Sequence, residues 1–176
     1  MKNAFSSENI NWLWRAAIIQ FFILFLFIVS LTNLSHLLGF KSGPYLFLIC
    51  VFYWSIYRPS MIPLVVSFLL GVIQDLVYEY PVGLHAILYT SFSVALRHQR
   101  IFLMGQTYLI LWLFFALCCL VYGFLEWSFF SIRYWDFFDL GPLISSVLIT
   151  IFLYPLMNWL FILLHRMLSS VSSIEN

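Results

Sequence analysis

The chain has 176 residues, of which 64% are hydrophobic and only 9% are charged. Soluble domains carry about 25% charged residues, so a water-soluble core of this length could not cover so much apolar surface. The composition therefore predicts an integral membrane protein. The formal net charge is +1 and the basic residues are scattered, which excludes a basic nucleic-acid-binding surface and predicts no nucleic-acid partner.

Charged residues divide the chain into six apolar blocks, and each block predicts one membrane-spanning helix. The expected fold is an all-α membrane protein, a six-transmembrane-helix bundle that forms a single integral domain over residues 1–176. The predicted spans are, in chain order, residues 14–38, 44–58, 60–80, 83–97, 101–126 and 141–165. The second, third and fourth spans are short, so they need interfacial side chains or locally thinned lipid.

The basic residues orient the predicted bundle. With the N-terminus inside, six basic residues fall in inner segments and two fall in outer loops. The inner set is Lys2, Arg15, Arg58, Arg97, Arg100 and Arg166, and the outer set is Lys41 and Arg133. The positive-inside rule therefore predicts that both termini are cytoplasmic.

Two acidic residues mark the outer end of the third span. Asp75 lies about 25 Å along this helix from its inner end, and Glu79 follows one turn later. Acidic side chains are unfavourable at a helix C-terminus, so a compensating partner is required. The candidates are Lys41, Arg133 and the backbone amides that open the next helix at Gly83–Ala86. We hypothesise that Asp75 accepts hydrogen bonds from these amides and so fixes a hairpin of the third and fourth spans.

The predicted hairpin turn contains three further candidate residues. Pro81 ends the third span, and Gly83 allows the backbone to turn tightly. His85 follows at the outer interface, where an imidazole that is satisfied by its neighbours is a better interpretation than a ligand-binding residue. Arg58 precedes Pro59 in a sharp turn at the inner side of the membrane.

One face of the third span carries small and polar residues, namely Ser67, Gly71, Gln74 and Tyr78. Ser67 and Gly71 are four residues apart, a spacing that lets another helix approach closely. The sequence leaves two interpretations open, an internal packing seam and a docking face for a helix of another protein.

Residues 127–141 form the one predicted loop long enough for extramembrane contacts, and it is rich in aromatic residues, Trp127 and Trp135 among them. Aromatic side chains favour the membrane interface, so this loop is interpreted either as a segment lying flat on the outer leaflet or as an anchor for a partner's membrane-proximal region.

No pattern in the sequence predicts catalysis. The chain has no nucleophile elbow, metal-ligand cluster or phosphate-binding loop, and its three cysteines, Cys50, Cys118 and Cys119, lie inside apolar blocks. The sequence therefore predicts neither an enzyme nor a metal or cofactor site.

Two stretches resemble the rod shape-determining protein MreD family, GPYLFLICVFYWSIYRP at 43–59 and FLLGVIQDLVYEYPVGLHAIL at 68–88. The resemblance is carried by a proline that opens an apolar helix, a Tyr-Trp pair, an Arg-Pro turn, a Gly-x-x-x-Asp motif, a proline and a Gly-Leu-His-Ala segment. In this sequence they are Pro44, Tyr53-Trp54, Arg58-Pro59, Gly71 with Asp75, Pro81 and Gly83-Leu84-His85-Ala86.

The resemblance implies a non-catalytic, multi-pass scaffold in the bacterial inner membrane, surrounded by membrane lipid. Such proteins bind MreC, a single-span protein with a periplasmic domain. They thereby connect MreB filaments to RodA and its partner transpeptidase, which build lateral peptidoglycan during cell elongation.

The family also resembles, in fold, the substrate-binding S-components of energy-coupling vitamin transporters. A vitamin-binding subunit is therefore the alternative function. The first span, AAIIQFFILFLFIVS, lacks the small residues at four-residue spacing with which S-components engage their transport partner, and this favours the scaffold.

Overall fold

The computed structural model describes the backbone of residues 7–32, 43–135 and 139–169, and the side chains of residues 17–32, 43–133, 135 and 139–164. Helices account for most of these ranges, and no strand occurs within them. The helices are α1 (Ser7–Leu31), α3 (Leu46–Tyr57), α4 (Leu64–Val77), α5 (Leu84–His98), α6 (Arg100–Met104), α7 (Tyr108–Tyr134) and α8 (Leu140–Ser169).

The helices differ greatly in length. At 1.5 Å per residue, α7 and α8, with 27 and 30 residues, are about 40 and 45 Å long. Their segments Tyr108–Arg133 and Leu140–Leu164 are apolar and long enough to cross a membrane. By contrast, α3, α4 and α5 have 12, 14 and 15 residues and are about 18–22 Å long, less than the roughly 30 Å hydrocarbon core. The count of six spans therefore stays a prediction.

Helix α3 is the central element of the bundle. Every residue from Leu46 to Ile56 is buried, and the helix packs against α1, α5, α6 and α8. A helix that is apolar all round is stable only when it is enclosed, which explains its central place. The outward faces of α1, α4, α7 and α8 carry exposed large apolar side chains instead, as expected of surfaces that face lipid.

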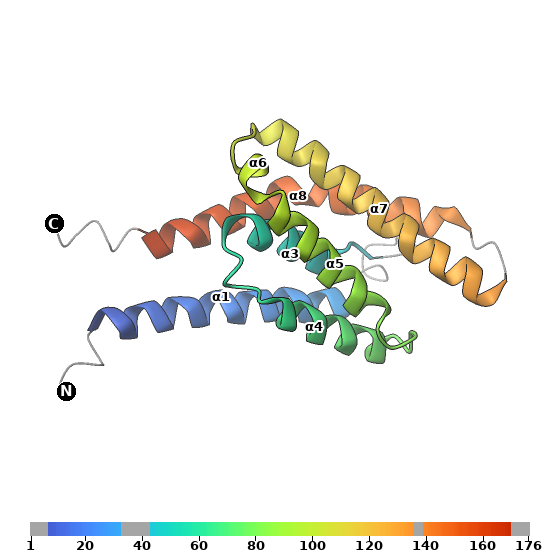
Figure 1. Cartoon of the computed structure of the whole chain (residues 1–176), viewed down its shortest axis with the longest axis horizontal. Coiled ribbons are helices and arrows are strands. Elements are labelled where there is room, and N and C mark those ends of the chain that lie inside the picture. Colours follow the sequence, from blue (N-terminus) through green and yellow to red (C-terminus); the bar gives the residue numbers. More distant parts are fainter. Residues whose placement is uncertain (1–6, 33–42, 136–138, 170–176) are drawn as a thin grey trace.

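The two ends of the bundle hold different connections. The start of α1 and the end of α8 lie at one end (Figure 1). The α4–α5 connection, the end of α7 and the start of α8 lie at the opposite end. This arrangement fits the predicted placement of both termini on one side of the membrane. Which end is periplasmic stays a prediction, and below we call the end with the α4–α5 connection the outer end.

The structure corrects the predicted outer loop at residues 127–141. Helix α7 continues to Tyr134, so the first eight residues of this stretch are helical. The physical reason is that no glycine or proline interrupts the chain between Gly123 and Gly141. The predicted fifth span also contains a break, because α6 ends at Met104 and α7 begins at Tyr108.

The connection between α3 and α4 is held from two neighbouring helices. Arg97 on α5 donates hydrogen bonds to two carbonyls of this connection, including that of Pro59 at 3.2 Å. Gln20 on α1 donates to the carbonyl of Met61. Arg58 caps the C-terminal end of α3, as the predicted sharp turn requires, whereas the site described below lies at the start of this helix.

Candidate functional site

Helices α4 and α5 form the most closely packed pair in the fold. At Gly71 a Cβ atom would lie only 2.4 Å from the Cα atom of Ala86, so glycine is needed for the two backbones to approach. Ser67 and Gln74, on the same stripe, are buried. The stripe is therefore an internal packing seam, one of the two interpretations left open by the sequence, and α5 occupies the face that an outside helix would have used.

Asp75 joins these two helices at the outer end. Its side chain is fully buried and accepts hydrogen bonds from the backbone N–H groups of Gly83, at 2.8 Å, and His85, at 3.1 Å. These amides open α5 and have no partner within their own helix, so the carboxylate satisfies them. Gly83 has φ of +108°, a conformation that favours glycine. These are the hydrogen bonds that the sequence predicted.

The end of α4 also has a defined geometry. The N–H of Tyr80 donates to the carbonyl of Asp75 at 2.8 Å, across Glu79, which has φ of 55°. This hydrogen bond, which spans residues 75–80, is typical of the Schellman motif that ends many helices. Glu79 occupies the position in this motif where glycine is usual. Pro81 follows and begins a turn in which its carbonyl accepts a hydrogen bond from Leu84 at 3.2 Å.

His85 lies between two carboxylates. Its Nδ1 is 2.7 Å from Oδ1 of Asp75, and its Nε2 is 3.4 Å from Oε1 of Glu126 on α7. Both nitrogens donate only when the ring is protonated, so two ionised carboxylates and one imidazolium leave a net charge of −1. The sequence reasoning missed the partnership with Glu126. The available signal was that Glu126 is the only charged residue between Arg100 and Arg133.

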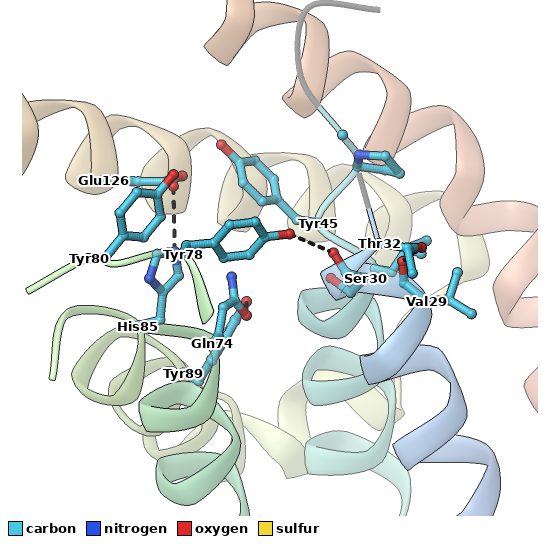
Figure 2. Close-up of a pocket in the computed structure, with 13 residues that line it drawn as sticks. Val29, Ser30, Thr32, Tyr45, Gln74, Tyr78, Tyr80, His85, Tyr89 and Glu126 are labelled. Atoms are coloured by element: carbon cyan, nitrogen blue, oxygen red, sulfur yellow. Dashed lines mark hydrogen bonds and ion pairs between the residues drawn. The ribbon is translucent and has the colours of Figure 1, made fainter. Parts of the chain in front are cut away.

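A polar cavity of about 110 Å³ lies beside this network (Figure 2). The ends of α1 and α4, the starts of α3 and α5 and the outer part of α7 surround it. Its lining residues are Val29, Ser30, Thr32, Gly43, Pro44, Tyr45, Leu46, Gln74, Tyr78, Tyr80, His85, Tyr89 and Glu126. Four of them are tyrosines, and the sequence analysis named only one of these, Tyr78, as part of the stripe on the third span.

Hydrogen bonds hold Tyr78 and Tyr89 to neighbouring helices. The hydroxyl of Tyr78 donates to the carbonyl of Ser30 at 3.1 Å, one of the carbonyls that the end of α1 leaves without a helical partner. The hydroxyl of Tyr89 donates to Oε1 of Gln74 at 2.9 Å. The cavity walls are therefore tied to each other across three helices.

The other predicted candidates lie away from the cavity. Trp127 is half-buried on α7 with its ring centroid 6.1 Å from that of Phe124. Trp135, just after α7, is 93% exposed and has φ of 54°. The structure thus brings Gln74, Asp75, Gly83 and His85 together and keeps Trp135 apart.

The network suits positioning and binding better than nucleophilic catalysis. Both nitrogens of His85 contact carboxylates, so neither is free to take a proton from a hydroxyl or thiol nucleophile. Among the residues that the structure describes, no group of three or more His, Cys, Asp or Glu side chains is arranged to hold a metal ion.

Comparison with known proteins identifies the family of this chain. The family model described as rod shape-determining protein MreD matches residues 11–167, a range that includes both helices of the hairpin and the whole cavity. No curated protein and no solved structure matched the chain. Because the family match extends over most of the sequence, the chain belongs to the MreD family of rod shape-determining membrane proteins.

Proposed function

We propose that this protein is a non-catalytic membrane scaffold of the rod complex that binds MreC. Through MreC it helps to couple MreB filaments to RodA and its partner transpeptidase, and so to lateral peptidoglycan synthesis. The protein acts as a multi-pass component of the bacterial inner membrane, with the outer end of its bundle in the periplasm.

The observation that carries the proposal is the family match over residues 11–167, because membership implies a role in rod shape determination and association with the rod complex. The distribution of polar groups supports a structural role. Asp75 and Gln74 are buried and bond to groups of this chain, whereas the outward faces of the long helices are apolar. Such faces can pack against lipid or against a partner's spanning helix.

Vitamin capture receives no comparable support. Pockets for drug-sized ligands measure roughly 300–1,000 Å³, whereas the cavity beside His85 measures about 110 Å³. The likeness to S-components stays a prediction that rests on the family resemblance alone.

Trp135 is the best-placed candidate for a contact with the membrane-proximal region of MreC. It is 93% exposed and follows the last turn of α7 at the outer end. Exposed tryptophans are frequent among the residues that dominate binding energy at protein interfaces.

The test is co-purification of the full-length chain with affinity-tagged MreC from solubilised membranes. We expect recovery of the wild-type chain well above the level obtained with untagged MreC. Trp135→Ala should reduce recovery several-fold without changing thermal stability. Trp159→Ala, which removes a 60% exposed tryptophan within α8, is the matched control and should leave recovery unchanged.

Two results would count against this proposal. Recovery of the wild-type chain at the untagged level would exclude stable binding to MreC. Equal recovery of Trp135→Ala and wild type would exclude Trp135 as the contact while leaving the binding itself in place.

A further inference from the structure

Carboxylates outnumber basic side chains beside the cavity in the described part of the chain. Asp75 and Glu126 flank a single imidazole, and the side chain of Glu126 is 17% exposed while that of Asp75 is fully buried. Among the described residues that line the cavity, none is lysine or arginine. A cation that entered the cavity would therefore meet the carboxylate of Glu126 with no lysine or arginine beside it among the described lining residues.

The cavity walls also suit a cation. Tyr45, Tyr78, Tyr80 and Tyr89 all contribute to the lining, and Tyr78 and Tyr80 stack with their ring centroids 5.5 Å apart. Aromatic faces attract ammonium groups within about 6 Å of the ring centroid, and the attraction is strongest where water is excluded.

Gln74 adds a hydrogen-bond donor. Its side chain is more than nine-tenths buried, and its Oε1 already accepts from Tyr89. Its amide nitrogen points into the cavity (Figure 2), and within the described part of the chain no hydrogen bond is assigned to it. Because this amide nitrogen faces the cavity, a ligand that accepts a hydrogen bond there would be favoured.

These features select one class of ligand. Glu126 and the tyrosine rings favour a primary ammonium group, and the amide of Gln74 favours an oxygen close to it. A volume of about 110 Å³ holds a small headgroup but not a drug-sized molecule. We propose that the cavity binds an ethanolamine-type group, in which an ammonium pairs with Glu126 and a nearby oxygen accepts from Gln74.

This inference does not depend on the role in the rod complex. A free amino alcohol and the headgroup of phosphatidylethanolamine present the same chemistry, so the experiment must separate these two sources. The probes are ethanolamine, ethylammonium and the neutral ethylene glycol. The full-length protein is placed in nanodiscs of phosphatidylcholine, whose trimethylated ammonium cannot donate hydrogen bonds.

We measure the thermal unfolding midpoint against probe concentration at constant ionic strength. Ethanolamine should raise the midpoint of the wild-type protein in a saturable way, and ethylene glycol should not. Glu126→Gln should weaken the apparent affinity for ethanolamine about tenfold or more, since it removes a charge-assisted hydrogen bond. Gln74→Leu should weaken binding of ethanolamine more than binding of ethylammonium, which has no oxygen.

The matched control is Glu79→Gln, which removes an exposed carboxylate outside the cavity lining and should leave the affinity unchanged. If Glu126→Gln fails to fold, the comparison of ethanolamine with ethylene glycol on the wild-type protein still decides the matter.

A second arm of the experiment distinguishes a lipid headgroup from a free amine as the ligand. If the lipid headgroup occupies the site, nanodiscs of phosphatidylethanolamine should raise the wild-type midpoint, and added ethanolamine should raise it no further. If a free amine is the ligand, only added ethanolamine should act. An absence of both effects, or equal effects in Glu126→Gln, would overturn the proposal.

Discussion

Replacing Asp75 should separate its charge from its hydrogen-bonding role in the hairpin. The carboxylate accepts from the N–H groups of Gly83 and His85 and from Nδ1 of His85, at 2.8, 3.1 and 2.7 Å. Leucine would leave all three groups buried without an acceptor, at about 1–3 kcal/mol each in water-soluble proteins. Because the unfolded chain in a membrane also finds partners, we expect a smaller sum, about 4 kcal/mol for Asp75→Leu.

Asparagine tests the contribution of the charge. Its single carbonyl can accept from His85, while its NH₂ group would face the N–H of Gly83, so we expect a loss of about 2 kcal/mol for Asp75→Asn. The assay is reversible unfolding of the purified protein by SDS titration from mixed micelles. Glu79→Gln, which changes an exposed acid at the end of the same helix, is the control and should change the free energy of unfolding by less than about 0.5 kcal/mol.

Two outcomes are informative. Equal destabilisation by asparagine and leucine would mean that the charge, and not the shape of the acceptor, holds the hairpin. If Asp75→Leu is no less stable than Glu79→Gln, the reasoning about this buried carboxylate is refuted.

Three further predictions follow from the packing and the backbone geometry. Gly71→Ala should destabilise the protein by about 3 kcal/mol in the same assay, because the added Cβ would lie 2.4 Å from Cα of Ala86. Gly105→Ala is the control and should change the stability by less than about 0.5 kcal/mol, because the atom nearest to its added Cβ lies 3.7 Å away. Glu79→Gly should stabilise by about 1 kcal/mol, because φ of 55° strains any residue with a Cβ, and a lower stability would contradict the assigned Schellman motif. Arg97→Met should speed cleavage of the α3–α4 connection by proteinase K, and an unchanged cleavage rate would show that its hydrogen bonds do not hold this segment.

The hairpin was predictable from sequence because its determinants are local. Asp75 and Gly83 are separated by eight residues, and helix-dipole arguments alone require a donor for a carboxylate at that position. The close approach at Gly71 followed in the same way from a small residue on a helix face. The sequence left open whether this face of the helix packs inside the bundle or binds a helix of another protein. The position of α5 against Gly71 answers this question.

The cavity was not predictable because its walls come from segments far apart in the chain. Glu126 lies forty-one positions after His85, and the predicted fifth span ended at this residue without assigning it a partner. The sequence analysis also ended the predicted fifth span at residue 126, whereas α7 continues to Tyr134. Aromatic residues are typical of membrane interfaces, but they also extend an apolar helix when no glycine or proline interrupts it, as α7 shows up to Tyr134.

The central claim is that the hairpin turn and its carboxylate network lie at the periplasmic end of a membrane-embedded bundle. Single cysteines at Val82, in this turn, and at Ser60, in the α3–α4 connection, test it directly because both positions are exposed. A membrane-impermeant maleimide applied to intact spheroplasts should label Val82→Cys at once and Ser60→Cys only after lysis. The reverse pattern, with Ser60→Cys labelled in intact cells and Val82→Cys protected, would contradict the orientation of the site and of its proposed partner contacts.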